Sequence, residues 1–219
     1  KKGETIAFIG STGSGKSTLI NLIPRFYDVT GGSIKIDGID VRDFKIKSLR
    51  QKIGFIRQKT LLFTGSIKSN IKFGKQEASH DEVVESAKTA QAYDFISKKE
   101  LKFDEPIGEG GSNVSGGQKQ RLSIARALVR KPEIYIFDDS FSALDFKTDA
   151  ILRAELKKET ADAIVLIVAQ RIGSIMEADK IIVLDEGKVV GCGKHKELLK
   201  SCSVYKEIAL SQLTEEELA

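Results

Sequence analysis

The chain has 219 residues, of which 41% are hydrophobic and 30% are charged, and its formal net charge is +4. This composition excludes an intrinsically disordered chain, and the length suits one large domain or two small subdomains with separate cores. Lysine and arginine are spread along the chain instead of forming a dense basic stripe, which disfavours a nucleic-acid-binding platform.

The first predicted elements are a strand, a helix and a hairpin. The apolar run at residues 5–9 indicates a buried strand that ends in a glycine-rich turn. Helical character at residues 17–23 ends at Pro24, which cannot continue a helix. Alternating residues at 33–41 lie on both sides of an Asp-Gly pair and predict a hairpin with a positive φ at Gly38.

The middle of the chain predicts a short strand and then a helical subdomain. Residues 53–56 are apolar, and mixed polar and apolar residues with helical spacing extend from position 66 to about 101. A glycine-rich loop at residues 108–117 leads into a predicted helix at 115–129. We therefore expect a helical subdomain over about residues 64–130.

The last third predicts more strands, separated by helices. The runs at residues 134–137, 163–168 and 181–184 are apolar without alternation, so both faces of each strand should be buried, as in a parallel sheet covered by helices. Helices are predicted at residues 147–158 and 172–178. The alternation of strands and helices predicts an α/β fold.

Several features of the chain point to a reducing compartment and to a longer parent protein. Cys192 and Cys202 have no metal-type spacing and are expected to be free thiols, which fits the cytosol. No run approaches the roughly 18 apolar residues of a membrane span. The chain opens at Lys1 without an initiator methionine or signal peptide, so we expect a piece of a larger protein. The acidic residues 214–219 predict a frayed helix.

The glycine-rich turn after the first strand has the pattern of a phosphate-binding loop, G-x-x-x-x-G-K-[S/T]. Glycines let successive backbone N–H groups turn inward and surround an anion, with the start of a helix adding positive charge. Lys16 is predicted to meet the β- and γ-phosphates of ATP, and Ser17 to ligate Mg²⁺. The alternative is a glycine-rich turn with a chance lysine. The predicted ATP-binding residues here are Ser11, Thr12, Gly13, Ser14, Gly15, Lys16, Ser17 and Thr18.

Two carboxylates follow the predicted strand at residues 134–137. In open α/β sheets, ligands bind outside the carboxyl ends of the strands. Asp138 is the predicted Mg²⁺ partner, and Asp139 stands where a general base would stand. Taken alone, the pair could equally end the strand in solvent, but the phosphate loop favours the metal role for Asp138.

These motifs, together with the signature-like run Val-Ser-Gly-Gly-Gln at residues 114–118, resemble those of the ABC nucleotide-binding domains. The resemblance extends from Lys1 to about residue 210. It implies a P-loop, RecA-like core with a parallel sheet, an antiparallel β-subdomain at the hairpin and a helical subdomain. It also implies ATP and Mg²⁺ as cofactors and a transmembrane domain before residue 1.

Further residues match family motifs one by one. Gln58 resembles the glutamine that ligates Mg²⁺ and senses the γ-phosphate, and Asp145 belongs to a Ser-Ala-Leu-Asp run that resembles the D-loop. Residues 108–111 resemble the X-loop of exporters, which is expected to touch the coupling helices of the membrane domain. The resemblance therefore implies a domain on the cytoplasmic face of the cell membrane.

The resemblance also implies that two such domains close head to tail around two ATP molecules. The signature residues would then clasp the γ-phosphate held by the partner domain, with no nucleic acid involved. A plainer role for the serine is that of an N-cap, and both roles use the same end of the helix. The signature residues are Ser115, Gly116, Gly117 and Gln118.

Two positions depart from the pattern of active family members. Asp139 replaces the usual glutamate, which sets its carboxylate roughly 1.5 Å further back. Gln170 takes the place of the switch histidine and cannot hold a cationic proton. The predicted catalytic residues are therefore Lys16, Asp139 and Gln170, in a degenerate site that binds ATP and turns it over slowly. His195 is expected to be a surface residue near a helix start.

These departures favour one subunit of a heterodimeric multidrug exporter, paired with a catalytically complete partner. A slow but competent homodimer is the alternative. Other readings are a nucleotide-dependent regulatory module, an importer ATPase, or a soluble ABC ATPase of DNA repair or translation. The X-loop-like segment argues against the importer, and the lack of long insertions argues against the soluble ATPase.

Overall fold

A computed structural model describes residues 1–214, and its centre is a mixed sheet of six strands. Every neighbouring pair in this sheet is parallel except the pair that joins β9 to β10 at one edge. In spatial order the strands are β10 (Lys188–Gly193), β9 (Lys180–Asp185), β1 (Thr5–Gly10), β8 (Ile164–Val168), β7 (Ile134–Asp138) and β4 (Ile53–Ile56). The predicted α/β fold with a parallel-dominated sheet is confirmed.

The apolar runs of these strands supply two hydrophobic cores, one on each face of the sheet. Successive side chains of a strand point to opposite faces. Accordingly Phe8 of β1 and Ile136 of β7 belong to one buried cluster, whereas Ile9 and Phe137 belong to the other. Burial on both faces explains why the sequence of these strands is continuously apolar.

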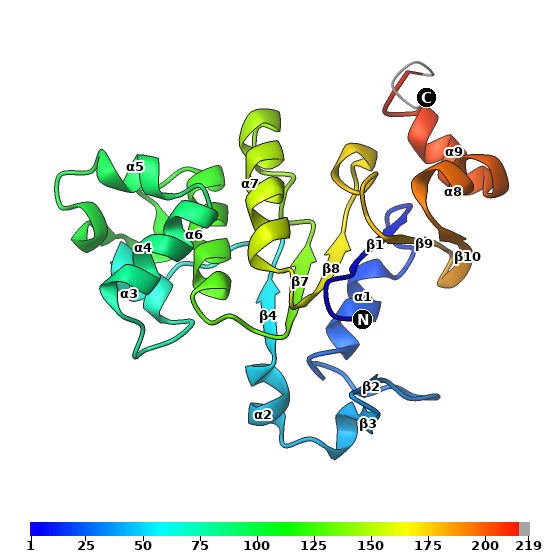
Figure 1. Ribbon diagram of the computed structural model, residues 1–219, viewed down its shortest axis with the longest axis horizontal. Coiled ribbons are helices and arrows are strands. Elements are labelled where there is room, and N and C mark those ends of the chain that lie inside the picture. The colour runs from blue at the N-terminus through cyan, green and yellow to red at the C-terminus, as the bar shows by residue number, and fades with distance from the viewer. Residues whose placement is uncertain (215–219) are drawn as a thin grey trace.

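Helices flank the sheet and form a separate group beyond β4 (Figure 1). Helices α8 and α9 lie beside β9 and β10, at the opposite end of the sheet from this group. Helix α7 covers the part of the sheet that lies between the two groups of helices. The helices are α1 (Lys16–Leu22), α2 (Ile46–Gln51), α3 (Ile67–Lys72), α4 (His80–Thr89), α5 (Tyr93–Ser97), α6 (Gly116–Leu128), α7 (Phe146–Glu159), α8 (His195–Ser201) and α9 (Ser203–Leu210). The group beyond β4 contains α3 to α6, the region in which the sequence predicts a helical subdomain.

Short strands and 3₁₀ turns complete the described part of the chain. The predicted hairpin is confirmed, and its turn has φ 52° at Asp37 and 81° at Gly38. The remaining elements are β2 (Lys35–Ile36), β3 (Ile39–Asp40), β5 (Gly65–Ser66), β6 (Pro106–Ile107), η1 (Val41–Asp43), η2 (Lys102–Asp104), η3 (Glu109–Gly111) and η4 (Ile172–Ser174). None of the helices in residues 1–214 combines the length and the apolar character that a membrane span requires.

The predicted helix at residues 172–178 is wrong. The structure has only the 3₁₀ turn η4 there, and Ile175 leaves the helical region with φ −129°. Ile172 and Ile175 are three positions apart, which suggests a helix, but both reach the hydrophobic core from a turn. The tertiary packing of these two side chains therefore takes precedence over the local helical pattern.

The chain after β9 also differs from the prediction. An unpredicted strand, β10, pairs antiparallel with β9 through a turn in which Glu186 and Gly187 both have positive φ, and its register shifts between Val189 and Gly191. The surface position expected for His195 is wrong, since its side chain is buried and its Nδ1 lies 2.7 Å from the hydroxyl oxygen of Tyr205. The packing of α8 against α9 encloses it. The frayed helix predicted at residues 214–219 falls almost wholly on residues 215–219, which lie outside the described residues.

Candidate functional site

The loop between β1 and α1 is shaped by glycines and held together by Lys16. Gly13 and Gly15 have φ of 84° and 96°, a conformation that glycine adopts without steric cost. The Nζ of Lys16 donates to the carbonyl oxygens of Gly10 and Ser11, each at 2.8 Å, and to Ser14 Oγ at 3.3 Å. The loop therefore curls around the ammonium group of its own lysine.

Gly10, at the end of β1, cannot be replaced by a larger residue. A Cβ atom built there would lie 2.0 Å from the carbonyl oxygen of Leu184 in β9. The loop thus leaves the sheet through a position that only glycine can occupy, which fixes its direction over the carboxyl ends of the strands.

The carboxylates at the end of β7 face the phosphate-binding loop. Ser17 Oγ donates to Asp138 Oδ1 at 3.0 Å, across 121 positions of sequence. Burial lowers the pKa of Lys16, and the negative charges of Asp139 and Asp138 oppose that shift. Burial raises the pKa of Asp138, and the hydrogen bond from Ser17 opposes it. The predicted loop and the predicted metal partner are therefore brought together.

This pair of side chains fits a magnesium ion. Mg²⁺ prefers oxygen ligands and is usually held by one or two carboxylates, a hydroxyl and phosphate oxygens. Ser17 and Asp138 supply a hydroxyl and a carboxylate oxygen at one point. When bound, the ion would neutralise charge on the phosphates of the nucleotide.

Asp139 is the most constrained residue of the site. Its backbone is left-handed, with φ 47°, and its N–H donates to the carbonyl oxygen of Val168. Its Oδ2 accepts hydrogen bonds from Gln58 Nε2 at 2.7 Å and from Gln170 Nε2 at 2.8 Å. Burial raises the pKa of Asp139, the hydrogen bond from Gln58 lowers it, and the charge of Asp138 raises it. The structure thus brings all three residues together.

Gln58 was predicted to ligate magnesium together with Ser17 and Asp138. In the structure its amide nitrogen donates a hydrogen bond to Asp139 Oδ2 instead. Its contact with the metal stays a prediction, since the side chain would have to turn toward the loop.

The signature residues begin α6 and form a capping box. Ser115 Oγ accepts from the N–H of Gln118 at 3.3 Å, and Gln118 Oε1 accepts from the N–H of Ser115 at 3.0 Å. Gly117 packs close to the D-loop, because a Cβ atom there would lie 3.3 Å from Ala143 O. Helix α6 starts on the far side of β4 and β7 from α1 (Figure 1). The signature and the phosphate-binding loop of one chain are thus separated.

The D-loop joins the acidic strand end to α7. Asp145 caps α7, with Oδ1 accepting from the N–H of Thr148 at 2.9 Å and Oδ2 from its hydroxyl at 2.8 Å. Arg171 stacks over the ring of Phe146 at 5.4 Å and donates to Ser142 O at 3.3 Å. Sequence reasoning missed this stack, which connects the D-loop to the loop that carries Gln170.

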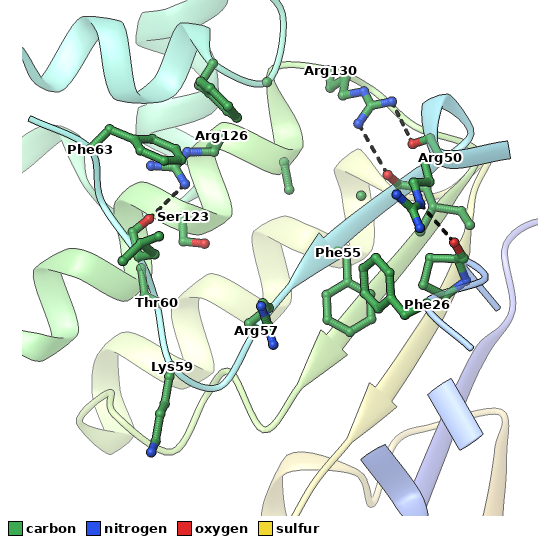
Figure 2. A pocket seen from close by; sticks show the side chains of 17 residues that line it. Phe26, Arg50, Phe55, Arg57, Lys59, Thr60, Phe63, Ser123, Arg126 and Arg130 are labelled. Carbon is green, nitrogen blue, oxygen red and sulfur yellow. Dashed lines mark hydrogen bonds between the residues drawn. The ribbon is translucent and has the colours of Figure 1, made fainter. Parts of the chain in front are cut away.

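A separate groove of about 330 Å³ lies between the sheet and the helical group (Figure 2). Arg126 lies over the rings of Phe63 and Phe73, at 5.2 and 5.8 Å, and donates to the carbonyl oxygens of Leu61 and Asn70. Burial lowers the pKa of Arg126 to about 10. Five cationic residues line the groove, and no acidic residue is among the described residues that do: Arg50, Arg57, Lys59, Arg126 and Arg130.

Comparisons with known proteins place this geometry in one family. The ABC transporter family profile matches residues 1–142. Candidate multidrug export ATP-binding/permease proteins of several Staphylococcus aureus strains, among them COL and Mu50, are 48% identical over 208 residues, which is 95% of this chain and 36% of theirs. The ATP-bound structure of a bacterial Atm1-family ABC exporter superposes with a TM-score of 0.92 at 38% identity, over 94% of this chain and 36% of the other. The chain thus spans about a third of the length of these relatives. With its phosphate-binding loop, acidic strand end and signature helix on a matching fold, this chain belongs to the ABC transporter family.

Proposed function

We propose that this chain is the ATP-binding motor domain of an exporter and hydrolyses ATP to drive efflux. The observation that carries the proposal is the hydrogen bond between Ser17 and Asp138, which joins the phosphate-binding loop to the acidic strand end. Residues 11–18 bind the triphosphate, and Lys16 exchanges the carbonyls of its own loop for phosphate oxygens. Ser17, Asp138 and a reoriented Gln58 hold Mg²⁺. The region of about residues 64–130 acts as the helical subdomain.

The second part of the proposal is a head-to-tail dimer with another ABC domain. The signature residues of one chain do not lie on its own phosphate-binding loop, so they are available to clasp the γ-phosphate of the partner's nucleotide. Ser115 keeps its capping role while its N–H-rich helix start faces the anion. Asp145 supports this arrangement by capping α7, which fixes the end of the D-loop, and Ala143 of that loop lies close to Gly117 of the signature helix.

The third part is that this chain's own site turns over slowly and that the partner is a different, catalytically complete subunit. A shorter acid at position 139 moves the carboxylate away from the attacking water, and a displacement near 1 Å can reduce a rate by about 100-fold. Gln170 donates its amide to Asp139 but, unlike a histidine, cannot carry a cationic proton. A regulatory module that binds ATP with little hydrolysis is the second candidate, favoured by the same two residues, Asp139 and Gln170.

The fourth part concerns the membrane. The relatives carry names that describe multidrug export, and we propose that this chain acts at the cytoplasmic face of a cell membrane, beneath a transmembrane domain. The groove in Figure 2 is the docking site for a coupling helix, together with the X-loop at η3. Its exposed phenylalanines suit apolar anchors, and its five cations suit an acidic segment.

The proposal is tested by nucleotide titration of Lys16→Ala. Removing the ammonium group should weaken ATP binding by at least about tenfold, because a charge-assisted contact to phosphate contributes roughly 1.5–3 kcal/mol. Lys88→Ala in α4 removes the same charge from an ion pair with Glu85 and should leave affinity unchanged. Fluorescent ATP analogues and isothermal titration give both values. Equal affinities for the two variants would exclude the phosphate role.

A further inference from the structure

The loop that carries Gln170 is held from behind by a side chain of the C-terminal segment. Gln212 Nε2 donates to the carbonyl oxygen of Gln170 at 2.7 Å, and Gln212 Oε1 accepts from the N–H of Ile172 at 2.8 Å. One amide group thus pairs with two backbone groups on either side of Arg171, in the way a neighbouring strand would. Ile172 is fully buried, so its N–H needs a protein acceptor, and Gln212 supplies it.

The backbone of Gln212 is itself held in place. Its N–H and that of Leu213 both donate to the carbonyl oxygen of Ala209, which continues the last turn of α9. Ala209 is fully buried, and Leu213 packs against the hydrophobic core. The amide is therefore presented from backbone anchored on both sides, although the side chain itself is exposed.

This contact continues into the nucleotide site. The side chain of Gln170 donates to Asp139 Oδ2, the atom that also accepts from Gln58. The path of hydrogen bonds runs from Gln212 through the main chain of Gln170 to Asp139. Loss of the Gln212 amide would free the carbonyl oxygen of Gln170, and the side chain of Gln170 could then leave Asp139.

We propose that Gln212 is a positioning residue for hydrolysis at this chain's own site, because it fixes the loop from which Gln170 orients Asp139. The inference rests on the proposed function. Gln212 has no contact with the phosphate-binding loop among the described contacts, so it acts on turnover and leaves ATP affinity unchanged. The C-terminal segment after α9 is then part of the catalytic apparatus.

The test uses the full-length transporter that contains this chain, with Gln212→Met as the main variant. Methionine keeps the length of the side chain and removes both hydrogen bonds. Turnover at this site should fall about three- to tenfold, the range expected for loss of one or two hydrogen bonds. To isolate turnover at this site, it is measured in a transporter in which the phosphate-loop lysine of the partner subunit, if that subunit is a different chain, is changed to alanine. The dissociation constant of ATP should change less than about twofold.

A second readout follows the loop directly. Hydrogen exchange in peptides that cover residues 169–173 should be faster in Gln212→Met than in the wild type. Gln212→Glu keeps an acceptor for Ile172 and loses the donor to Gln170, so it should retain protection at Ile172 while lowering turnover. Ser211→Ala, which loses only a bond to Ile208 O at the end of α9, should match the wild type.

Three results would overturn the inference. Unchanged turnover in Gln212→Met would remove the positioning role, and unchanged exchange would show that the contact does not hold the loop. A parallel loss of turnover, ATP affinity and thermal stability would indicate a purely structural role. A wild-type protein that binds no ATP would instead refute the proposed function, and the exchange experiment would still report on the contact of Gln212.

Discussion

The carboxylate of Asp139 is held by two amides that reach it from different loops. Gln58 comes from the loop after β4 and Gln170 from the loop after β8, and both donate to the same oxygen. Together these two hydrogen bonds fix the direction in which the carboxylate points. The left-handed backbone at this residue further limits how far the short side chain can move.

Replacing Asp139 and Gln170, the two residues that depart from the family pattern, should raise ATP hydrolysis at this site. Asp139→Glu extends the carboxylate toward the nucleotide, and Gln170→His supplies a ring that can carry a proton. We expect single-site turnover in the assembled transporter to rise at least about tenfold, since a correction near 1 Å is worth up to about 100-fold. Phosphate release measured with labelled ATP gives the rate.

The matched control makes the same two chemical changes outside the site. Asp94→Glu in α5 and Gln76→His before α4 are exposed positions and should leave turnover unchanged. Flat turnover in the Asp139→Glu, Gln170→His protein would contradict the account of a degenerate site.

At the scale of elements, α3 and α6 meet through backbone. Gly74 follows α3, and a Cβ atom there would lie 1.9 Å from the carbonyl oxygen of Arg126 and 3.1 Å from a methyl group of Val129. Arg126 in turn donates back to Asn70 of α3. Helices α3 and α6 are thus joined at Gly74 by a backbone contact that leaves no room for a Cβ atom.

Gly74→Ala should destabilise the chain by about 1–3 kcal/mol, the usual cost of overpacking. Gly31→Ala is the control, because a Cβ atom at Gly31 meets nothing within 4 Å and its φ is not left-handed. That variant should stay within about 0.5 kcal/mol of the wild type. Urea unfolding followed by circular dichroism measures both, and equal midpoints would mean that α3 moves freely relative to α6.

Elements whose signal is local were predicted from the sequence, and those that depend on distant partners were not. The buried strands are evident as apolar runs, and the residues around Lys16 as one contiguous motif. Strand β10 carries glycines and lysine in place of an apolar run, and it exists because β9 offers it an edge. The pairing of Gln212 with Gln170 spans 42 positions and leaves no trace in local spacing.

At the scale of the whole molecule, the groove in Figure 2 has no residue of the phosphate-binding loop among the described residues that line it. It receives side chains from β4, from α6 and from the segment between α3 and α4. A partner docked there, as we propose, would touch the sheet and the helical group at the same time. Docking can therefore transmit a movement of one part relative to the other.

Phe73→Glu tests the proposed docking of a membrane domain in this groove. The ring is 61% exposed and lies on the guanidinium of Arg126, so a carboxylate removes the apolar anchor and neutralises the arginine. We expect transport-substrate stimulation of ATP turnover to be lost while ATP binding is kept. Leu101→Glu changes a residue that is 57% exposed and outside the groove, and it should behave as wild type. Stimulation that persists in Phe73→Glu would place the docking site elsewhere.

The register shift in β10 affects how molecules meet at high concentration. A sheet border with regular, unpaired amides can template strands from other copies, which leads to aggregation. Here the border is irregular between Val189 and Gly191 and carries ammonium groups at Lys188 and Lys194. Such an edge offers no straight row of hydrogen-bonding groups to a strand of another molecule. The register shift and these charges therefore disfavour the addition of a strand from another copy at this edge.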